Sequence, residues 1–477
     1  MSTPRALYLA GRPVTSGASL DITDKRTGAV AATVCAASRV DIDRAIAAAA
    51  SAATACRRWP SHRRAAALEQ LAAELARRSA HIADLLVTEV GKPITAARAE
   101  VARAIDTFRF SAAECGRQLG EHLPMDLAPR GEGYEGLVKR VPVGPCSFIL
   151  PFNFPLNLLA HKVGPAIAAG CPWVAKPDPR TPLTALALGE ILASCNLPEG
   201  SWSILPVAPN ADGLELFSED PRFRLLSFTG SPAVGWALRA KAGMKKVVLE
   251  LGGNAAAIVD DTADLDTAAT KLAAGAFGVS GQSCISVQRI YAHRSILAPL
   301  TERLVARATA TTVGDPRDER IVVGPMIDER EAQRVQEWVN QAVDAGARLL
   351  CGGTRTGHTY HPTVLTTVDP RAMISCREVF GPVVIIDAYD TFDEALAAVN
   401  DSDFGLQAGL FSRDIGRIRK AWDELEVGGV MVNEAPTWRM DHMPYGGVKA
   451  SGLGREGVRS AIDDMTEPRL LVLGPTP

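Results

Sequence analysis

Apolar residues in the N-terminal quarter of the chain recur every three or four positions, which is the spacing of an amphipathic helix. Ala-rich stretches with this spacing predict helices over residues 41–58, 61–87 and 95–120. A short apolar run at 7–14 predicts a strand before them, and 133–141 predicts another strand after them. This part of the chain is therefore predicted to be mostly helical.

From Val143 onward, short apolar β-type runs alternate with helical patterns. Strands are expected at 143–150, 173–176, 203–206, 225–228 and 246–251, with helices between them at 156–169, 182–194, 211–218 and 232–241. This alternation predicts βαβ units and a parallel, doubly wound sheet with helices on both faces. Ligands of such sheets bind at the carboxyl ends of the strands.

A second alternating block follows Gly252-Gly253 and runs to about Tyr445. Its strands are expected at 256–259, 289–292, 383–387 and 428–432. The chain then ends on an apolar strand at 469–473, which is an unpaired edge unless it joins another sheet. We expect it to pair with a neighbouring subunit.

Charge and cysteine content narrow the classes of protein. The net charge is −3, so no nucleic acid or anionic membrane is expected as a partner. The N-terminus has no apolar signal region, and no apolar stretch is long enough to span a bilayer. Nine cysteines without a C-x-x-C pair favour reduced thiols in the cytoplasm over a disulfide or zinc framework.

Two familiar motifs fail in their context. Gly452-Leu-Gly-Arg-Glu-Gly457 matches the dinucleotide fingerprint G-x-G-x-x-G, but a loop precedes it where a strand is required, so a helix-entry loop is expected. His358 and His361 lack a Cys or carboxylate in a suitable pattern, so no metal site is expected there.

Polar residues stand at the ends of the predicted strands instead. Asn153, in Pro151-Phe-Asn-Phe-Pro155, is either a rigidly held amide donor or a turn former. Lys176 is either a ligand of ribose or phosphate or an exposed strand end. Ser231 and Gly235 begin a helix whose N-terminus favours an anion such as pyrophosphate, unless Ser231 is an ordinary N-cap.

Glu250 and Cys284 complete this series. Glu250 ends an apolar strand, where burial would raise its pKa and suit a general base, although an exposed edge position is the alternative. Cys284 lies in a loop of Gly and Ser residues that a substrate can approach. Each signal is weak alone, but strand-end residues in succession followed by an accessible thiol point to a reaction site.

Together these residues resemble the NAD(P)-dependent aldehyde dehydrogenase superfamily over nearly the whole chain. The motifs that carry the resemblance are Pro151-Phe-Asn-Phe-Pro155, Lys176-Pro177, Phe228-Thr-Gly-Ser231, Leu249-Glu-Leu-Gly-Gly253, Gly281-Gln-Ser-Cys284, Glu378-Val-Phe-Gly-Pro382, Pro444-Tyr-Gly-Gly447 and Ser451-Gly-Leu-Gly-Arg-Glu456. The chain looks closest to lactaldehyde-, succinate-semialdehyde- and phosphonoacetaldehyde-type members.

The resemblance implies a role for each site residue. Cys284 would attack the aldehyde, Asn153 and the Cys284 backbone N–H would stabilise the oxyanion, and Glu250 would activate water to release a free acid. Hydride would pass to NAD or NADP. The expected cofactor contacts are Lys176, Pro179, Arg180, Gly230, Ser231, Gly235, Leu251, Glu378 and Phe380. Pro179 and Arg180 leave the choice between NAD and NADP open.

Substrate residues are less defined. Ser283 precedes the nucleophile at a position where some members acting on phosphorylated or phosphonate aldehydes carry Arg, which weakens the case for such a substrate. Residues that would line a positive substrate mouth are His161, Arg103, Arg109, Arg289 and Arg439. Trp438, in a segment that resembles the same members, is a further candidate substrate residue.

The implied fold is α/β, with two doubly wound Rossmann-like domains and a small β oligomerisation arm. The cofactor-binding domain would cover 1–124 and 144–252, the catalytic domain 253–445, and the arm 125–143 and 458–477, giving a homodimer or homotetramer. Two alternatives stay open: a thiol hydrolase using Cys284, Glu250 and Lys176, or a non-catalytic binding or structural protein on the same scaffold.

Overall fold

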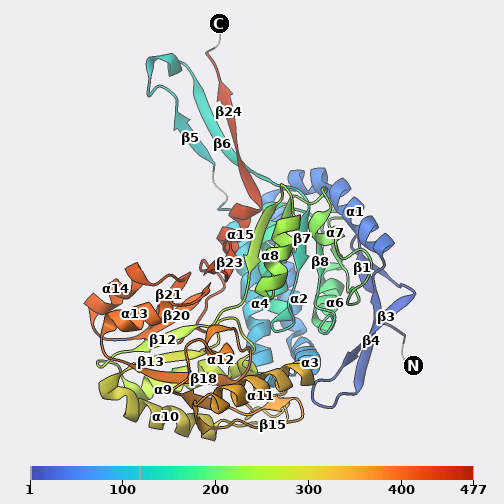
Figure 1. Ribbon diagram of the computed structural model, residues 1–477. Coiled ribbons are helices and arrows are strands. Elements are labelled where there is room, and N and C mark those ends of the chain that lie inside the picture. Colours follow the sequence, from blue (N-terminus) through green and yellow to red (C-terminus); the bar gives the residue numbers. More distant parts are fainter. Residues whose placement is uncertain (1–2, 118–119, 476–477) are drawn as a thin grey trace.

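The computed structural model describes residues 3–117 and 120–475, and it contains two α/β bodies and a projecting arm (Figure 1). The sheet of the first body has eight strands, and its parallel centre is β9-β8-β7-β10-β11. In spatial order the strands are β2 (Arg12–Val14), β1 (Leu7–Leu9), β9 (Trp202–Ile204), β8 (Trp173–Lys176), β7 (Cys146–Ile149), β10 (Leu225–Thr229), β11 (Lys246–Glu250) and β23 (Gly452–Leu453).

Alternating side chains bury both faces of this sheet. Phe148 and Ala175 pack in the cluster formed with α5 and α6, whereas Val174 packs against α1 on the opposite face. The helices of this body are α1 (Arg39–Arg58), α2 (Ser61–Arg77), α3 (Ser79–Val90), α4 (Ile94–Glu114), α5 (Pro155–Ala169), α6 (Leu183–Leu192), α7 (Leu216–Glu219), α8 (Pro232–Lys241) and α15 (Val458–Asp464). The predicted doubly wound parallel sheet is therefore confirmed.

The second body repeats this architecture with seven strands, which are parallel except for the pair β14 and β17. Their order is β14 (Arg348–Cys351), β17 (Thr363–Thr366), β18 (Val383–Tyr389), β13 (Arg289–His293), β12 (Ala256–Val259), β20 (Gln407–Phe411) and β21 (Gly429–Val432). One face packs on α9 (Leu265–Phe277) and α10 (Leu297–Ala310). The other packs on α11 (Glu329–Asp344), α12 (Met373–Cys376), α13 (Phe392–Asn400) and α14 (Ile415–Glu424).

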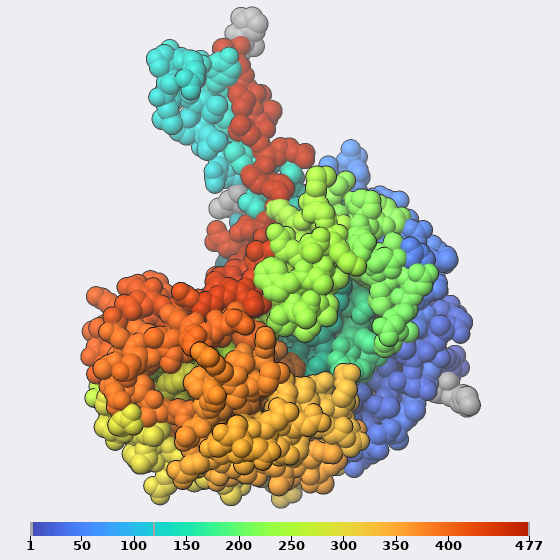
Figure 2. Space-filling view, in the orientation of Figure 1, coloured from blue at the N-terminus to red at the C-terminus, as the bar shows by residue number. Residues whose placement is uncertain are grey.

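The arm is a three-stranded antiparallel sheet that stands clear of both bodies (Figure 2). It contains β5 (Glu121–Pro124), β6 (Glu135–Pro142) and β24 (Thr466–Leu473), with the short helix η1 (Pro129–Gly131) between β5 and β6. Small hairpins elsewhere are β3 (Ala18–Thr23) with β4 (Val30–Ala36) and β15 (Arg355–Thr356) with β16 (Thr359–Tyr360). A further pair joins β19 (Phe404–Gly405) to β22 (Val448–Lys449).

Several element predictions were wrong. The run 7–14 is a hairpin, because Ala10 and Gly11 adopt φ of 52° and 81° and turn the chain. The helix predicted over 61–87 breaks at Arg78, and most of 211–218 is irregular. The segment 452–457 is not all loop, since its first two residues pair with β11.

The C-terminal strand joins the arm sheet through one of its two edges. β24 pairs with β6 of its own chain, from Thr466 opposite Pro142 to Leu473 opposite Glu135. β24 is the outer strand of the arm sheet, and its second edge has no pairing strand among the described residues, so pairing with a neighbouring subunit stays a prediction. Among the described residues, no helix is long and apolar enough to cross a membrane, and no cluster of metal-ligating side chains forms.

Candidate active site

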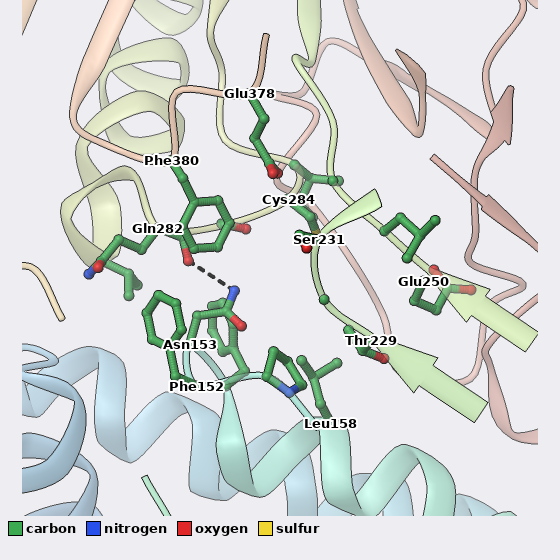
Figure 3. Close-up of a pocket in the computed structure, with 18 of the residues that line it drawn as sticks. Phe152, Asn153, Leu158, Thr229, Ser231, Glu250, Gln282, Cys284, Glu378 and Phe380 are labelled. Atoms are coloured by element: carbon green, nitrogen blue, oxygen red, sulfur yellow. Dashed lines mark hydrogen bonds between the residues drawn. The ribbon is translucent and has the colours of Figure 1, made fainter. Parts of the chain in front are cut away.

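A cavity of about 860 Å³ opens where the parallel strands of the first sheet end, and residues of both bodies line it (Figure 3). Asn153 reaches it from the turn after β7, and Glu250 from the last position of β11. Cys284 reaches it from the loop after α9 and the short helix η2 (Gly278–Gly281). The structure thus brings the three predicted catalytic residues to one cavity.

Cys284 is half-buried, and its Sγ lies 2.9 Å from the hydroxyl of Tyr445. Burial raises the pKa of the Cys284 thiol to about 12, and the hydrogen bond from Tyr445 opposes this rise. Without that hydrogen bond the pKa of the thiol would be higher still, and less of it would be thiolate. Sequence reasoning did not single out Tyr445, although it lies in the quoted motif Pro444-Tyr-Gly-Gly447.

The loop before Cys284 has a strained backbone. Val279 and Ser280 adopt φ of 52° and 56°, which is uncommon for residues with a side chain. The Ser280 hydroxyl donates a hydrogen bond of 2.8 Å to the Gly324 carbonyl, which holds this conformation. Gly281 also has positive φ, and a Cβ there would lie 2.1 Å from the carbonyl oxygen of Gly381. The loop is therefore fixed on both sides of the turn that presents the thiol.

Asn153 is almost fully buried, and its amide Nδ2 donates to the Gln282 carbonyl at 3.0 Å (Figure 3). The helix α5 that follows is held at its start by Glu100 of α4, which accepts from the N–H groups of Leu156 and Asn157 at 3.0 and 3.1 Å. Glu100 is itself paired with Lys92 in the interior. The amide next to the thiol loop is thus fixed from behind by a buried ion pair.

Glu250 is 3% exposed, and neither carboxylate oxygen has a hydrogen-bond partner among the described residues. Burial and the nearby carboxylate of Glu456 raise its pKa well above the usual value, while Arg439, Lys162 and Arg455 oppose the rise. The alternative of an exposed edge position is excluded. A buried carboxyl with free acceptors and a raised pKa is the chemistry expected of a general base.

Polar groups suited to a dinucleotide lie around the same cavity. Glu378 accepts from the Gly253 N–H at 3.0 Å, and burial raises its pKa to about 7. Burial lowers the pKa of Lys176. The Thr229 hydroxyl, at the end of β10, is buried with no hydrogen-bond partner in the described part of the chain. Ser231 starts α8 without capping it through its side chain, so the helix N-terminus keeps free N–H groups.

Ion pairs hold Arg180 in place, and both Arg180 and Phe380 contact the ring of Phe152. The Arg180 guanidinium is paired with Asp178 at 2.9 Å and with Asp328 at 3.3 Å, and it lies 4.5 Å from the centre of the Phe152 ring. Phe380 meets the same ring edge-on, with 5.8 Å between centroids. The described residues therefore fit NAD(P), which the cavity is large enough to hold beside a small aldehyde.

Most of the predicted cofactor and substrate residues line this cavity, but several do not. Those that line it are Lys176, Arg180, Gly230, Ser231, Leu251, Glu378, Phe380, Arg103, Ser283 and Arg439. Those placed outside it are Pro179, Gly235, His161, Trp438, Arg109 and Arg289. Gly235 supports the cavity indirectly, because a Cβ there would lie 2.4 Å from the side chain of Leu251.

The packing of the chain explains why several predicted substrate residues lie outside the cavity. Arg109 lies six residues after Arg103 on α4, so it occupies another face of the helix and pairs with Asp106 at 3.5 Å. Arg289 is buried in the second sheet and donates to the Asn254 carbonyl at 3.1 Å. His161 is 1% exposed behind the cavity wall, and Trp438 is 46% exposed. Further lining residues that sequence reasoning passed over include Asn157, Arg334, Trp338 and Glu456.

Comparison with known proteins identifies the family. The model of the Aldehyde dehydrogenase family matches residues 14–471. The chain belongs to the aldehyde dehydrogenase family. The sequence is 44% identical over 470 residues to a 3-sulfolactaldehyde dehydrogenase of Priestia aryabhattai, covering 98% of this chain and 97% of the relative.

Solved structures of other aldehyde dehydrogenases have the same fold. Aldehyde dehydrogenase 21 from Physcomitrella patens, in complex with the reaction product succinate, matches with a TM-score of 0.97 and 47% identity over 99% of each chain. A glyceraldehyde-3-phosphate dehydrogenase from Methanocaldococcus jannaschii, complexed with NADP, matches with a TM-score of 0.92 and 35% identity over 95% of this chain and 99% of its own. This aldehyde dehydrogenase is therefore an NAD(P)-dependent oxidoreductase acting on aldehydes, as the sequence predicted, and nothing favours the two alternatives.

Proposed function

We propose that this enzyme oxidises a small aldehyde with an anionic group at its far end to the corresponding acid, by covalent catalysis at Cys284. The Cys284 sulfur bonds to the aldehyde carbon as the thiol loses its proton, and the carbonyl oxygen gains negative charge. The Asn153 amide and the Cys284 backbone N–H stabilise that oxyanion. Loss of hydride from the carbon restores the carbonyl as a thioester, and NAD(P)⁺, when bound, supplies the hydride acceptor.

Hydrolysis of the thioester is assigned to Glu250. Its free carboxylate oxygens take a proton from water, the hydroxide oxygen bonds to the acyl carbon, and the carbon–sulfur bond breaks to return Cys284. Lys176 and Glu378 would hold the two riboses of the cofactor, and the N-terminus of α8 at Gly230 and Ser231 would meet its pyrophosphate. These roles keep the reacting carbon between the sulfur and the base.

The observation that carries the anionic substrate is a pair of arginines in the cavity. Arg439 is nearly buried, its guanidinium lies 3.7 Å from the centre of the Tyr445 ring, and its Nε has no hydrogen-bond partner among the described residues. Arg103, which is one-third exposed, lines the same cavity. Arg439 pairs with Glu456 and Arg103 with Asp441, and the unpartnered Nε leaves Arg439 a donor for a further anion.

Local charge favours a monoanion. Arg103, Arg439 and Lys162 face the carboxylates of Asp441 and Glu456, so the cluster has one surplus positive charge. Burial and the Glu456 carboxylate raise the pKa of Glu250, which disfavours a further negative charge beside this cluster. A carboxylate or a sulfonate supplies one charge, whereas a phosphate ester supplies up to two. The relatives named for sulfolactaldehyde and sulfoacetaldehyde, and the relative solved with succinate, support this choice.

A matched pair of substrates tests the proposal. Succinate semialdehyde and butanal both have four carbons, and a carboxylate in the first replaces the methyl group of the second. Sulfoacetaldehyde is a second anionic aldehyde, with a sulfonate in place of the carboxylate. The proposal expects kcat/KM for the two anionic aldehydes to exceed that for butanal by roughly a hundredfold, which is the scale of one desolvated ion pair. Equal kcat/KM values would overturn the anionic substrate. NAD⁺ and NADP⁺ are both supplied, because the residues described accommodate either.

The arm supports self-association. Consecutive residues Leu470 to Leu473 of β24 are between 42% and 52% exposed, so apolar side chains lie on both faces of a three-stranded sheet. Sheets of this kind require a partner to cover them. We propose that a second copy of this chain covers the arm in a homodimer or homotetramer, which light scattering after gel filtration would test; a monomer would contradict it.

We also propose that the protein works in the cytoplasm. All nine cysteines are unpaired, which agrees with the reducing conditions of that compartment.

A further inference from the structure

A buried carboxylate behind the cavity gathers side chains from two helices. Asp441, 4% exposed, accepts from Arg103 through two hydrogen bonds of 2.7 and 3.1 Å. Asp441 also accepts from Asn157 Nδ2 at 3.0 Å and lies 2.8 Å from His161 Nε2. Arg103 comes from α4, and Asn157 and His161 come from successive turns of α5. Asp441 therefore fixes the direction of Arg103 by a bidentate pair, which is the strongest orienting contact available to an arginine.

His161 also contacts the second cavity arginine, Arg439. Arg439 Nη2 lies 3.2 Å from His161 Nε2 and 3.5 Å from its Nδ1, and it donates to Glu456 at 3.1 Å. Burial and Arg439 lower the pKa of His161, so the ring is neutral at physiological pH. Nε2 is the ring nitrogen nearest to both Asp441 and Arg439, so His161 contacts the two side chains at once. Asp441 and His161 thus form one chain of contacts between the two cavity arginines.

This chain of contacts ends beside the nucleophile. Arg439 packs on Tyr445, and the hydroxyl of Tyr445 lies 2.9 Å from Cys284 Sγ. Arg439 therefore lies about one aromatic ring away from the reacting sulfur. We propose that Asp441 and His161 are positioning residues, which aim Arg103 and Arg439 at the anionic end of the substrate and so determine selectivity for anionic aldehydes. This inference rests on the proposed function.

Asp441→Asn separates positioning from simple electrostatics. The substitution removes a negative charge near the anion site, so a purely electrostatic effect would lower KM for succinate semialdehyde. If Arg103 and Arg439 instead lose their orientation, the KM for succinate semialdehyde rises by roughly tenfold or more, which is the scale of one charge-assisted hydrogen bond. The proposal expects that rise, with kcat and the KM for butanal within about twofold of the wild type. Asp441→Glu should recover part of the selectivity because it restores the charged acceptor.

Controls keep the test independent of folding and of the proposed function. Asp220→Asn breaks a similar bidentate pair with Arg222 away from the cavity and should change neither KM. If Asp441→Asn fails to fold, His161→Gln, which leaves the pair between Asp441 and Arg103, should raise the same KM by a smaller factor. Calorimetric binding of succinate to Cys284→Ala protein, with and without Asp441→Asn, gives a readout without turnover, and binding should weaken.

Each outcome has one meaning. If the wild type does not prefer succinate semialdehyde to butanal, the proposed substrate class fails and the positioning role fails with it. If the wild type shows the preference but Asp441→Asn and His161→Gln leave the KM for succinate semialdehyde and the affinity for succinate unchanged, or tighten them, only the positioning role is overturned.

Discussion

The hydroxyl of Tyr445 lies 2.9 Å from the sulfur of Cys284, and the guanidinium of Arg439 lies on the ring of the same tyrosine. The proposed nucleophile is thereby connected to a buried cation through one aromatic side chain. Because the hydroxyl donates to sulfur, it stabilises the thiolate relative to the thiol.

Tyr445→Phe should raise the pKa of Cys284 further and slow thioester formation by roughly tenfold, since a hydrogen bond to a charged group is lost. The rate of iodoacetamide alkylation across pH reports the thiolate, and the pre-steady-state burst of NAD(P)H reports the chemical step. Tyr134→Phe on the exposed arm is the matched control. Alkylation at an unchanged rate in Tyr445→Phe would contradict this role of the hydroxyl.

Glu250 predicts a pH dependence for thioester hydrolysis. A base acts in its deprotonated form, so a raised pKa means that the hydrolysis rate increases as pH rises through that pKa. Glu456→Gln removes a like charge and releases the cations Lys162 and Arg439. Both effects lower the pKa of Glu250 and should move the profile of kcat to lower pH.

The measurement is steady-state turnover across pH under conditions where hydrolysis limits the rate, which the size of the NAD(P)H burst establishes. Glu434→Gln, which breaks a pair with Lys271 outside the cavity lining, should leave the profile in place. A shift of the Glu456→Gln profile to higher pH would show that another group limits hydrolysis.

Asp178 is predicted to affect cofactor choice. Its carboxylate lines the cavity beside Lys176 and holds Arg180 by a bidentate pair at 2.9 and 3.0 Å. Asp178→Asn removes a charge that repels a 2′-phosphate and leaves Arg180 with only its longer pair to Asp328, so the guanidinium can meet that phosphate. The ratio of kcat/KM for NADP⁺ to that for NAD⁺ should rise about fivefold or more. Asp318→Asn, where the same Asp–Arg geometry occurs at Arg320 outside the cavity lining, should leave the ratio unchanged.

The buried pair of Lys92 and Glu100 supports the Asn153 turn. Both side chains are fully buried, and Lys92 also lies 3.7 Å from the centre of the Phe154 ring. Glu100→Gln leaves Lys92 charged without its partner, so the free energy of unfolding should fall by about 3–5 kcal/mol. Denaturant unfolding measures this change.

The matched control is Glu199→Gln, which breaks a pair with Arg12 whose side chains are more than three-quarters exposed. Its effect should stay below about 1 kcal/mol. Similar losses in the two variants would mean that Lys92 and Glu100 do not form an interior ion pair in solution.

The regular part of the fold was predictable from local pattern. Strands β8 and β12 and helix α8 begin and end at the predicted residues, because each is an apolar or periodic run that a turn signal ends on both sides. The boundary at Arg78 was missed because the Ala-rich pattern continues through it and no Gly or Pro marks the break.

Site residues could be predicted from the sequence where a position at the end of a strand is enough to bring them together. Lys176 and Glu250 end parallel strands and Asn153 follows one, and the carboxyl ends of these strands meet at one edge of a sheet. Side-chain direction was not predictable. Arg103 and His161 looked equivalent in the sequence, but the packing of α4 on α5 sends Arg103 into the cavity and seals His161 behind its wall.

Mass spectrometry of the Glu250→Gln variant tests the central claim most directly. Mixed with NAD(P)⁺ and succinate semialdehyde, this variant should form one NAD(P)H per site in a burst and then stall, because the thioester forms but water is not activated. Proteolysis of the stalled enzyme should give an acylated peptide containing Cys284, and Cys284→Ala should give neither burst nor adduct. Sustained turnover without an adduct, or acylation at another cysteine, would contradict covalent catalysis at Cys284.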